Sequence, residues 1–552
     1  MVLRQATFQF LRRIRPSSSY TSRQITGNAL PNSLSNKLKF SCKLDRGSNT
    51  RRKNCWNPSL WIVLAGQAAT IIGVNANFAI AEDASIESGS ENHSEGANSG
   101  LRKIEDGSII SNSHTSKWRI FTDNGREFFL QGKLEQAEQF FSSALQEAKE
   151  GFGEKDPHVA SACNNLAELY RVKKEFEKAE PLYLEAINIL EESFGPEDIR
   201  VGAAFHNLGQ FYLMQRKLEK ALLCYERALK IKGRVLGHAH HDYAETMYHL
   251  GTVLHLQGRD KNAEALILDS IQILEEGGEG YSTLCIKRMR YLAQIYLKSN
   301  RLAEAENVQR KILHIMEISK GWDSLDTVIA AERQALTLEA IGNLDEAQEL
   351  LERCLHARKS LLPEDHIQIG GNMLHIARVV MLKANKLSKM QTSEAIAELD
   401  KANDLLYNAY RIAWQVLNKV AKQKGNGQIY GAPGEARRDG HAALVILLQS
   451  LDTLGLVEIN KQELKAPVEK HSTGNEAENA LLNCISAYKE FANQRLISDH
   501  PDVKAQYLSC LKRLSSLINN GVRQSRKHTL QELKDEIQRV EGEVSSQRKK
   551  KQ

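Results

Sequence analysis

Small and large side chains recur along this chain with a fixed spacing of 42 positions. An alanine returns at every step from residue 137 to residue 347, and a small residue stands twelve positions before each alanine. A large residue follows the small one three positions later, as Tyr212 follows Gly209. Helices approach closely only where side chains are small, so each unit is predicted to be a pair of antiparallel helices. The alanines are Ala137, Ala179, Ala221, Ala263, Ala305 and Ala347.

The composition agrees with an all-α fold. Aromatic residues make up 6% of the 552 residues, and there are only 10 prolines. Alanine, leucine, glutamate and lysine are abundant, and these residues lose little side-chain freedom in a helix. A hydrophobic fraction of 41% excludes a disordered chain.

The loops between units identify the type of repeat. In residues 152–157, Gly153 is followed three positions later by Asp156–Pro157. In residues 194–198, Gly195 is followed directly by Pro–Glu–Asp. Glycine ends one helix, and aspartate or proline opens the next. The register resembles the tetratricopeptide repeat, in the 42-residue form of kinesin light chains. The resemblance implies an α-solenoid, a right-handed superhelix of helix hairpins, whose concave groove binds extended peptides of partner proteins.

The repeat divides the chain into segments. Residues 116–412 are predicted to form the solenoid, with six regular repeats and a seventh if residues 386–392 are an insertion that moves the matching alanine to Ala395. Residues 413–523 are predicted to form degenerate helical hairpins that cap the solenoid. Residues 524–552 are predicted to form a charged helix and tail.

The N-terminal segment has a different composition. Residues 1–81 hold 12 Lys/Arg and one acid, Asp45, which is typical of an organelle presequence. Residues 60–81 carry no charge, so they either contact or span a membrane as an anchor or form a second sorting signal that is cleaved after Ala81. Early arginines favour the mitochondrion, and the alternative is the chloroplast, including its thylakoid. In either organelle, cleavage would leave the protein in an intermembrane or lumenal space. Residues 82–115 are predicted to be an acidic flexible linker.

Charge and cysteine spacing limit the classes of function. Residues 82–552 carry 62 Lys/Arg and 67 Asp/Glu, a net charge of −5, which argues against a nucleic-acid partner. An organellar RNA-associated helical-repeat factor remains the alternative to a protein scaffold. The eight cysteines include no CxxC pair, so they are interpreted as small apolar residues of helices.

The repeat register places polar side chains along the predicted groove. Asparagine offers a donor and an acceptor, which the backbone of an extended peptide needs. The alternative is that these amides only bond to neighbouring helices or to water. The residues predicted to bind peptide are Asn164, Asn165, Glu168, Arg171, His206, Asn207, Gln210, Tyr248, His249 and Arg290.

The sequence offers no sign of catalysis, cofactor binding or a metal site. No set of nucleophile, base and orienting residue is visible, and the glycine clusters lack the lysine of a phosphate-binding loop. The nearest approach to a metal site is His238, His240, His241 and Asp242, in a loop where solvated polar residues are expected. A non-enzymatic scaffold or adaptor that binds a partner protein is therefore predicted.

Overall fold

The computed structural model describes residues 113–387, 391–425, 433–465, 474–492, 500–520 and 527–549, which all fall within one compact unit, Ile62–Gln552. Every regular element in these ranges is a helix. The predicted presequence, the apolar segment 60–81 and the acidic linker up to residue 112 lie outside the described residues, as do Cys42 and Cys55.

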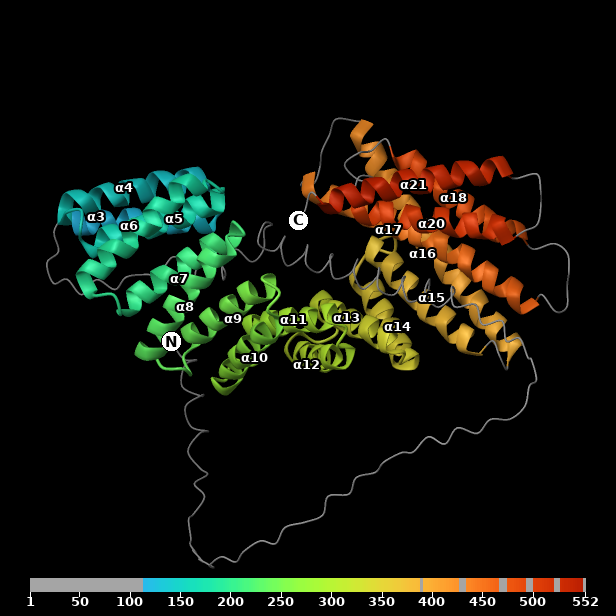
Figure 1. The fold of residues 1–552 in the computed structure, drawn as a ribbon, viewed down its shortest axis with the longest axis horizontal. Coiled ribbons are helices and arrows are strands. Elements are labelled where there is room, and N and C mark those ends of the chain that lie inside the picture. The colour runs from blue at the N-terminus through green and yellow to red at the C-terminus, as the bar shows by residue number, and fades with distance from the viewer. Residues whose placement is uncertain are drawn as a thin grey trace, which may run out of the picture. The chain divides into compact units, whose positions relative to one another are not determined.

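The helices from α3 to α16 follow one another as pairs, and each helix packs against its partner and against the next pair (Figure 1). The paired helices are α3 (Ser113–Leu130) and α4 (Leu134–Phe152), α5 (Pro157–Lys173) and α6 (Phe176–Phe194), α7 (Ile199–Met214) and α8 (Leu218–Val235), α9 (His241–Leu256) and α10 (Asp260–Glu276), α11 (Thr283–Lys298) and α12 (Leu302–Lys320), α13 (Leu325–Ile341) and α14 (Leu344–Leu361), and α15 (Ile367–Leu387) and α16 (Thr392–Gly425). After them come α17 (Pro433–Lys465), α18 (Gly474–Ala492), α20 (Pro501–Asn520) and α21 (Lys527–Lys549).

The small residues of the repeat are where paired helices touch. All six regularly spaced alanines, and Ala395, have 0% of their surface exposed. At Gly209 on α7, a Cβ atom would come within 2.9 Å of the ring of Tyr225 on α8, and at Gly251 within 2.9 Å of Ile267. The space that glycine leaves is therefore filled by a large residue of the second helix, and not by the large residue three positions later that the pattern suggested.

The predicted loop chemistry is also present. Gly153 follows α4 with φ of 88°, a backbone conformation that suits glycine. The Asp156 side chain then accepts a hydrogen bond of 2.8 Å from the backbone N–H of His158, and Pro157 begins α5. Asp198 caps α7 in the same way through Arg200. These caps satisfy backbone groups that the helix ends would leave without partners.

A tyrosine–glutamate hydrogen bond joins successive repeats at equivalent places. The hydroxyl groups of Tyr170, Tyr212 and Tyr296 donate to Glu138, Glu180 and Glu264, over 3.0, 2.8 and 2.9 Å. In each case the tyrosine lies on the first helix of one repeat and the glutamate on the second helix of the repeat before. A lysine or arginine also pairs with each of the three carboxylates. We call these contacts the Tyr–Glu clamps.

Where the fourth repeat meets the third, the clamp is absent and both of its residues are apolar. Leu254 occupies the tyrosine position, and Leu222 occupies the glutamate position. Leu254 is buried with 5% of its surface exposed, and the half-buried Leu222 packs in the same hydrophobic cluster. A polar pair is thus replaced by an apolar pair on both sides of the contact at once.

The C-terminal helices depart from the 42-residue period. Helix α16 has 34 residues and runs through residue 412 without a break, so the predicted boundary there does not coincide with a helix end. Within the described residues, one segment, Arg438–Lys465 of α17, is long and apolar enough to cross a membrane, with a mean hydropathy of 1.7. Since 72% of its apolar stretch is buried against other helices, it has the features of a core helix.

The interpretation of all eight cysteines as apolar residues is wrong for two of them. Cys163, Cys224, Cys285 and Cys354 are buried thiols, and burial raises the pKa of each. Cys484 of α18 and Cys510 of α20, however, form a disulfide with their Cα atoms 6.5 Å apart. They meet because α18 and α20 pack side by side, a contact that the period of the repeats does not specify.

Candidate functional site

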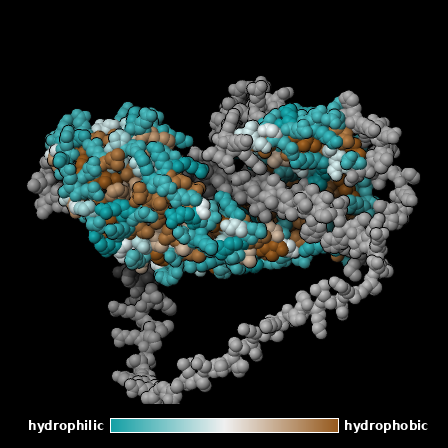
Figure 2. All heavy atoms as spheres, in the orientation of Figure 1, coloured by the Kyte–Doolittle hydropathy of each residue, from teal (hydrophilic) through white to brown (hydrophobic). Residues whose placement is uncertain are grey.

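The residues predicted to bind peptide lie on four first helices, α5, α7, α9 and α11. Helix α5 contacts α7, and α7 contacts α9, so the first helices of successive repeats are direct neighbours. Because the predicted residues occupy equivalent positions in the repeat, they lie along the same side of these helices. On the face drawn in Figure 2, hydrophilic and hydrophobic side chains are interspersed over the repeats.

The predicted residues divide into two groups by exposure. Five are buried between helices, with 1–8% of their surface exposed, and five are half-buried. The buried residues are Asn165, Glu168, His206, Asn207 and Tyr248. The half-buried residues are Asn164, Arg171, Gln210, His249 and Arg290. The second group is the one that offers polar atoms to a peptide, because the side chains of the first are buried among the helices.

Several of these side chains bond to one another across successive first helices. Asn207 donates through Nδ2 to Oδ1 of Asn164, over 3.0 Å. The Nε2 atom of Gln210 lies 3.1 Å from Nε2 of His206 and 3.4 Å from Nε2 of His249. The amides of Asn164 and Asn207 therefore bond neighbouring helices to each other, which was the alternative to binding a peptide. We call this row of bonded side chains the polar seam.

Glu168 and Arg171 are tied to each other at one end of the seam. The Arg171 guanidinium lies 2.8 Å from the Glu168 carboxylate, which is 2% exposed. Tyr183 of α6 donates its hydroxyl to the same carboxylate. Burial, together with the charge of Glu168, raises the pKa of Tyr183 well above its ordinary value. This carboxylate therefore serves the packing of α5 on α6.

The middle of the seam is rich in cationic groups. Burial lowers the pKa of His249 to about 3, and the positive charges of Lys287, Arg288, Lys232 and Arg171 act in the same direction. His249 is therefore neutral at physiological pH. Lys287 is exposed, whereas the Arg288 and Lys232 side chains are buried. Arg288 donates to the backbone carbonyl of Ser270 over 3.0 Å.

Sequence reasoning missed four residues of this region. Lys232, Glu245, Thr246 and Arg288 lie outside the positions that the repeat register assigns to the groove. A lysine at position 232 of α8, where the neighbouring repeats have Leu190 and Leu274, was one signal in the sequence. The separation of Glu245 and His249 by four positions, which places both on one face of α9, was another.

The loop histidines do not converge on a common point. His240 caps α9 by accepting the backbone N–H of Asp242 over 3.0 Å. His238 packs edge-on against the ring of Tyr243, with the ring centres 4.9 Å apart. His241 lies 3.5 Å from the carboxylate of Asp242. These contacts account for the loop as a helix cap and its packing.

Comparison with known proteins identifies the repeat. Models of the tetratricopeptide repeat match residues 127–192, 158–234, 200–276 and 335–368. A search of curated proteins finds no match. Tetratricopeptide-repeat proteins typically mediate contacts between proteins, and the family is in general a non-enzymatic scaffold.

The solved structures to which this chain is similar include three with 14–17% sequence identity. BtubC (BKLC) from P. vanneervenii is 17% identical over 46% of this chain and 93% of its own, with a TM-score of 0.35. A putative kinesin light chain from Podosopora anserina with nearly identical TPR-like repeats is 16% identical over 38% of this chain and 99% of its own, with a TM-score of 0.34. The apo form of RapI is 14% identical over 54% of this chain and 98% of its own, with a TM-score of 0.36. From the family matches and the register of its helix pairs, this chain is an all-α solenoid that carries tetratricopeptide repeats.

Proposed function

We propose that this protein is an adaptor of an organelle and binds an extended, acidic segment of a partner protein along the first helices α5 to α11. The observation that carries the proposal is the excess of cationic and hydrogen-bonding groups on this side of the solenoid. Arg171, Gln210, His249 and Arg290 are half-buried there, and Lys287 is exposed. Half-buried polar groups hold a ligand well because their side chains lose little further freedom on binding.

The charges favour an acidic segment over a neutral or basic one. Burial is the main cause of the lowered pKa of His249, and the charges of Lys287 and Arg288 lower it further, so the positive potential extends to the centre of the seam. A partner carboxylate would meet this potential at a site where the protein lowers the effective dielectric constant. Gln210 and Asn164 offer amide groups to the N–H and C=O groups of the partner backbone.

The organelle is proposed from two kinds of observation. The arginine-rich and nearly acid-free composition of residues 1–81 is that of a presequence, with the mitochondrion favoured over the chloroplast. The disulfide between Cys484 and Cys510 supports an oxidising compartment, such as an intermembrane or lumenal space. Residues 60–81 would provide any membrane contact. A fluorescent protein fused to residues 1–100 should enter the organelle, and a diffuse cytosolic signal would contradict the proposal.

The binding proposal is tested with a peptide library displayed on phage and selected on the full chain. The selected peptides should be enriched in Asp and Glu. In titrations of a labelled selected peptide, Lys287→Glu should weaken binding about tenfold, because it removes one attraction and adds one repulsion. The matched control is Lys261→Glu, which makes the same change at an exposed position of the second helix α10. Equal affinities of both variants, or peptides without acidic residues, would refute the proposed site.

A separate experiment distinguishes an RNA partner from a protein partner. Retention of the protein on an RNA column that falls steeply with rising salt would favour the RNA-associated alternative. The net charge of −5 over residues 82–552 leads us to expect no such retention at moderate salt.

A further inference from the structure

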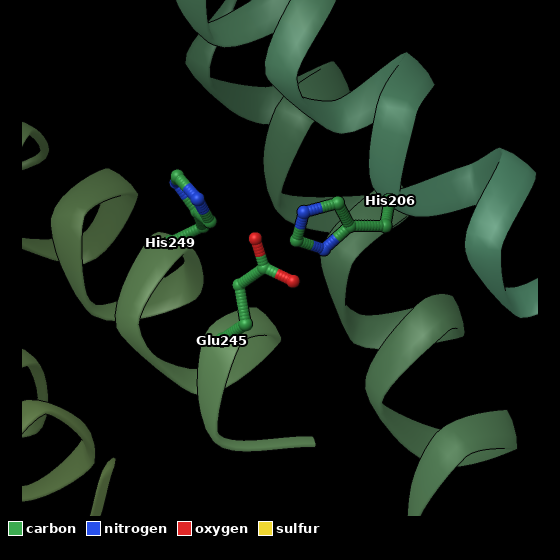
Figure 3. Close-up of side chains that lie close together, drawn as sticks. All are labelled: His206, Glu245 and His249. Atoms are coloured by element: carbon green, nitrogen blue, oxygen red, sulfur yellow. The ribbon is translucent and has the colours of Figure 1, made fainter. Parts of the chain in front are cut away.

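Three side chains of the third and fourth repeats point toward one another (Figure 3). His206 extends from α7, while Glu245 and His249 extend from neighbouring turns of α9. One ligand atom from each residue can be chosen so that all three atoms lie within 4.8 Å of one another. Two imidazoles and one carboxylate form a set of donors that commonly binds transition metals.

A network behind His206 determines which of its ring nitrogens carries the hydrogen. Lys232 donates to the hydroxyl of Thr246 over 2.9 Å, and this hydroxyl donates in turn to the backbone carbonyl of Asp242 over 3.0 Å. The Nδ1 atom of His206 lies 3.0 Å from the same hydroxyl. When the hydroxyl gives its one hydrogen to this carbonyl, Nδ1 of His206 is the donor.

In this arrangement Nε2 of His206 keeps its lone pair. A hydrogen bond from the second ring nitrogen to the surrounding protein is the usual way in which a metal-binding histidine is oriented. The Nε2 atom of His206 also lies on the side of the ring that faces Gln210. The amide nitrogen of Gln210 lies near Nε2 of His249 as well. The buried Thr246, which is 0% exposed, thus holds the imidazole in a form suited to coordination.

The other two residues lie close to His206. The ring centre of His249 is 5.2 Å from that of His206, and Nε2 of His249 lies 3.4 Å from Nε2 of Gln210. Within the part of the chain that the structure describes, no hydrogen bond or close ion pair holds the carboxylate of Glu245. Its charge acts on Arg288 and on His241 without direct contact. A half-buried carboxylate aimed between two imidazoles lacks the partner that such a group normally has.

We propose that His206, Glu245 and His249 bind one divalent transition-metal ion, of which zinc fits the donors best. Two nitrogen ligands and one oxygen ligand suit zinc, whereas calcium and magnesium prefer oxygen ligands throughout. Zinc bonds of about 2.1 Å separate tetrahedral ligands by about 3.4 Å, so the side chains would move inward by about 1 Å. Rotation of the Gln210 amide would offer its oxygen as a fourth ligand, and water is the other choice.

The surrounding positive charges oppose every divalent cation, so coordination by the two imidazoles and the carboxylate would be the source of affinity. Lys232, Lys287, Arg288 and Arg171 all act on His249, and Glu245 is the acid that joins them at the site. An ion bound here would connect α7 to α9. This is the junction at which Leu222 and Leu254 replace the Tyr–Glu clamp, so the ion would supply a polar contact between repeats where that clamp is absent.

The proposal is tested by titrating zinc into the full chain after removal of metals with a chelator. Competition with a chromophoric chelator should give a stoichiometry of one, and bound cobalt should show the intense visible absorption of a four- or five-coordinate site. Glu245→Gln keeps the size of the side chain and removes its charge, so the dissociation constant for zinc should rise at least about tenfold. His249→Ala should do the same, and neither change should lower the melting temperature of the metal-free protein by more than a few degrees.

The matched control is the double variant His238→Ala/His241→Ala, which removes two histidines from the neighbouring loop. This variant should bind zinc as the unchanged chain does. Loss of binding in the loop variant, or binding that survives both Glu245→Gln and His249→Ala, would overturn the proposed site. Absence of zinc binding at micromolar concentration would overturn it as well. No peptide enters this titration, so the outcome is separate from the test of the peptide-binding proposal.

Discussion

The change Tyr212→Phe isolates one Tyr–Glu clamp. It removes only the hydroxyl that donates to Glu180 over 2.8 Å and leaves the ring in place. Burial alone would raise the pKa of Glu180, but Tyr212 and Lys220 together lower it, so the bond is made to a charged carboxylate. Buried hydrogen bonds to charged groups contribute about 1.5–3 kcal/mol. Because 28% of the Glu180 side chain is exposed, we expect a loss of about 1–1.5 kcal/mol for Tyr212→Phe.

Hydrogen exchange is the suitable assay because a repeat array can open locally. A loss of about 1–1.5 kcal/mol corresponds to a fall of about five- to twelvefold in amide protection. The fall should centre on α6 and α7, which the clamp joins, and should fade toward α13. In a double-mutant cycle, Tyr212→Phe and Glu180→Gln should show a coupling energy of about 1 kcal/mol.

Tyr243→Phe provides the matched control. Within the described residues, the hydroxyl of this half-buried tyrosine forms no hydrogen bond, so its removal should change protection by less than about twofold. The double change Glu180→Leu/Tyr212→Leu copies the natural pair Leu222 and Leu254, and it should be more stable than either single leucine variant. Equal effects of Tyr212→Phe and Tyr243→Phe, or a uniform loss of protection along the solenoid, would refute the reasoning.

Three further predictions follow from other contacts. Gly209→Leu should cost about 1–3 kcal/mol or more by forcing the Tyr225 ring aside, and hydrogen exchange should show the loss around residues 200–260. Without reductant, alkylation of the denatured chain should label two fewer thiols than after reduction, and Cys484→Ser/Cys510→Ser should destabilise the C-terminal helices by up to about 3.5 kcal/mol, as expected for a separation of 26 residues. Burial lowers the pKa of His375 to about 4, so stability should be complete above pH 6.5 and fall as the pH drops from 6.5 toward 4; His375→Gln should make denaturation midpoints less sensitive to pH over this range.

The period of the repeats was sufficient to predict the helix pairs. A small residue fixes where two helices touch, and its register is independent of the rest of the fold, so Ala137 and Ala347 could both be assigned to buried contacts. The caps at Asp156 and Asp198 follow from local chemistry for the same reason. Ala395 could be placed only by assuming an insertion, and it is indeed 0% exposed on α16.

The candidate site was less predictable, because exposure depends on how close neighbouring repeats come. The register places Asn165 and Gln210 on the same side of their helices, yet Asn165 is 2% exposed and Gln210 is half-buried. The repeat register shows which face of a helix a residue occupies, but it does not give the distance from that residue to the next helix. The Cys484–Cys510 disulfide was missed for a related reason, since α18 and α20 meet beyond the last regular repeat.

The junction between the third and fourth repeats has its polar contacts at a different place from the junctions that carry a Tyr–Glu clamp. At three other junctions the contact between repeats includes a charged Tyr–Glu clamp, but here Leu222 and Leu254 make that contact apolar. The polar groups of this junction lie instead around His206 and Thr246, where Lys232 of α8 bonds to α9. Apolar packing is tolerant of small shifts, whereas hydrogen bonds between buried groups specify one geometry. Because this junction lacks the clamp, its alignment depends on the histidine network, and a ligand or ion that binds this network would act on the angle between the third and fourth repeats.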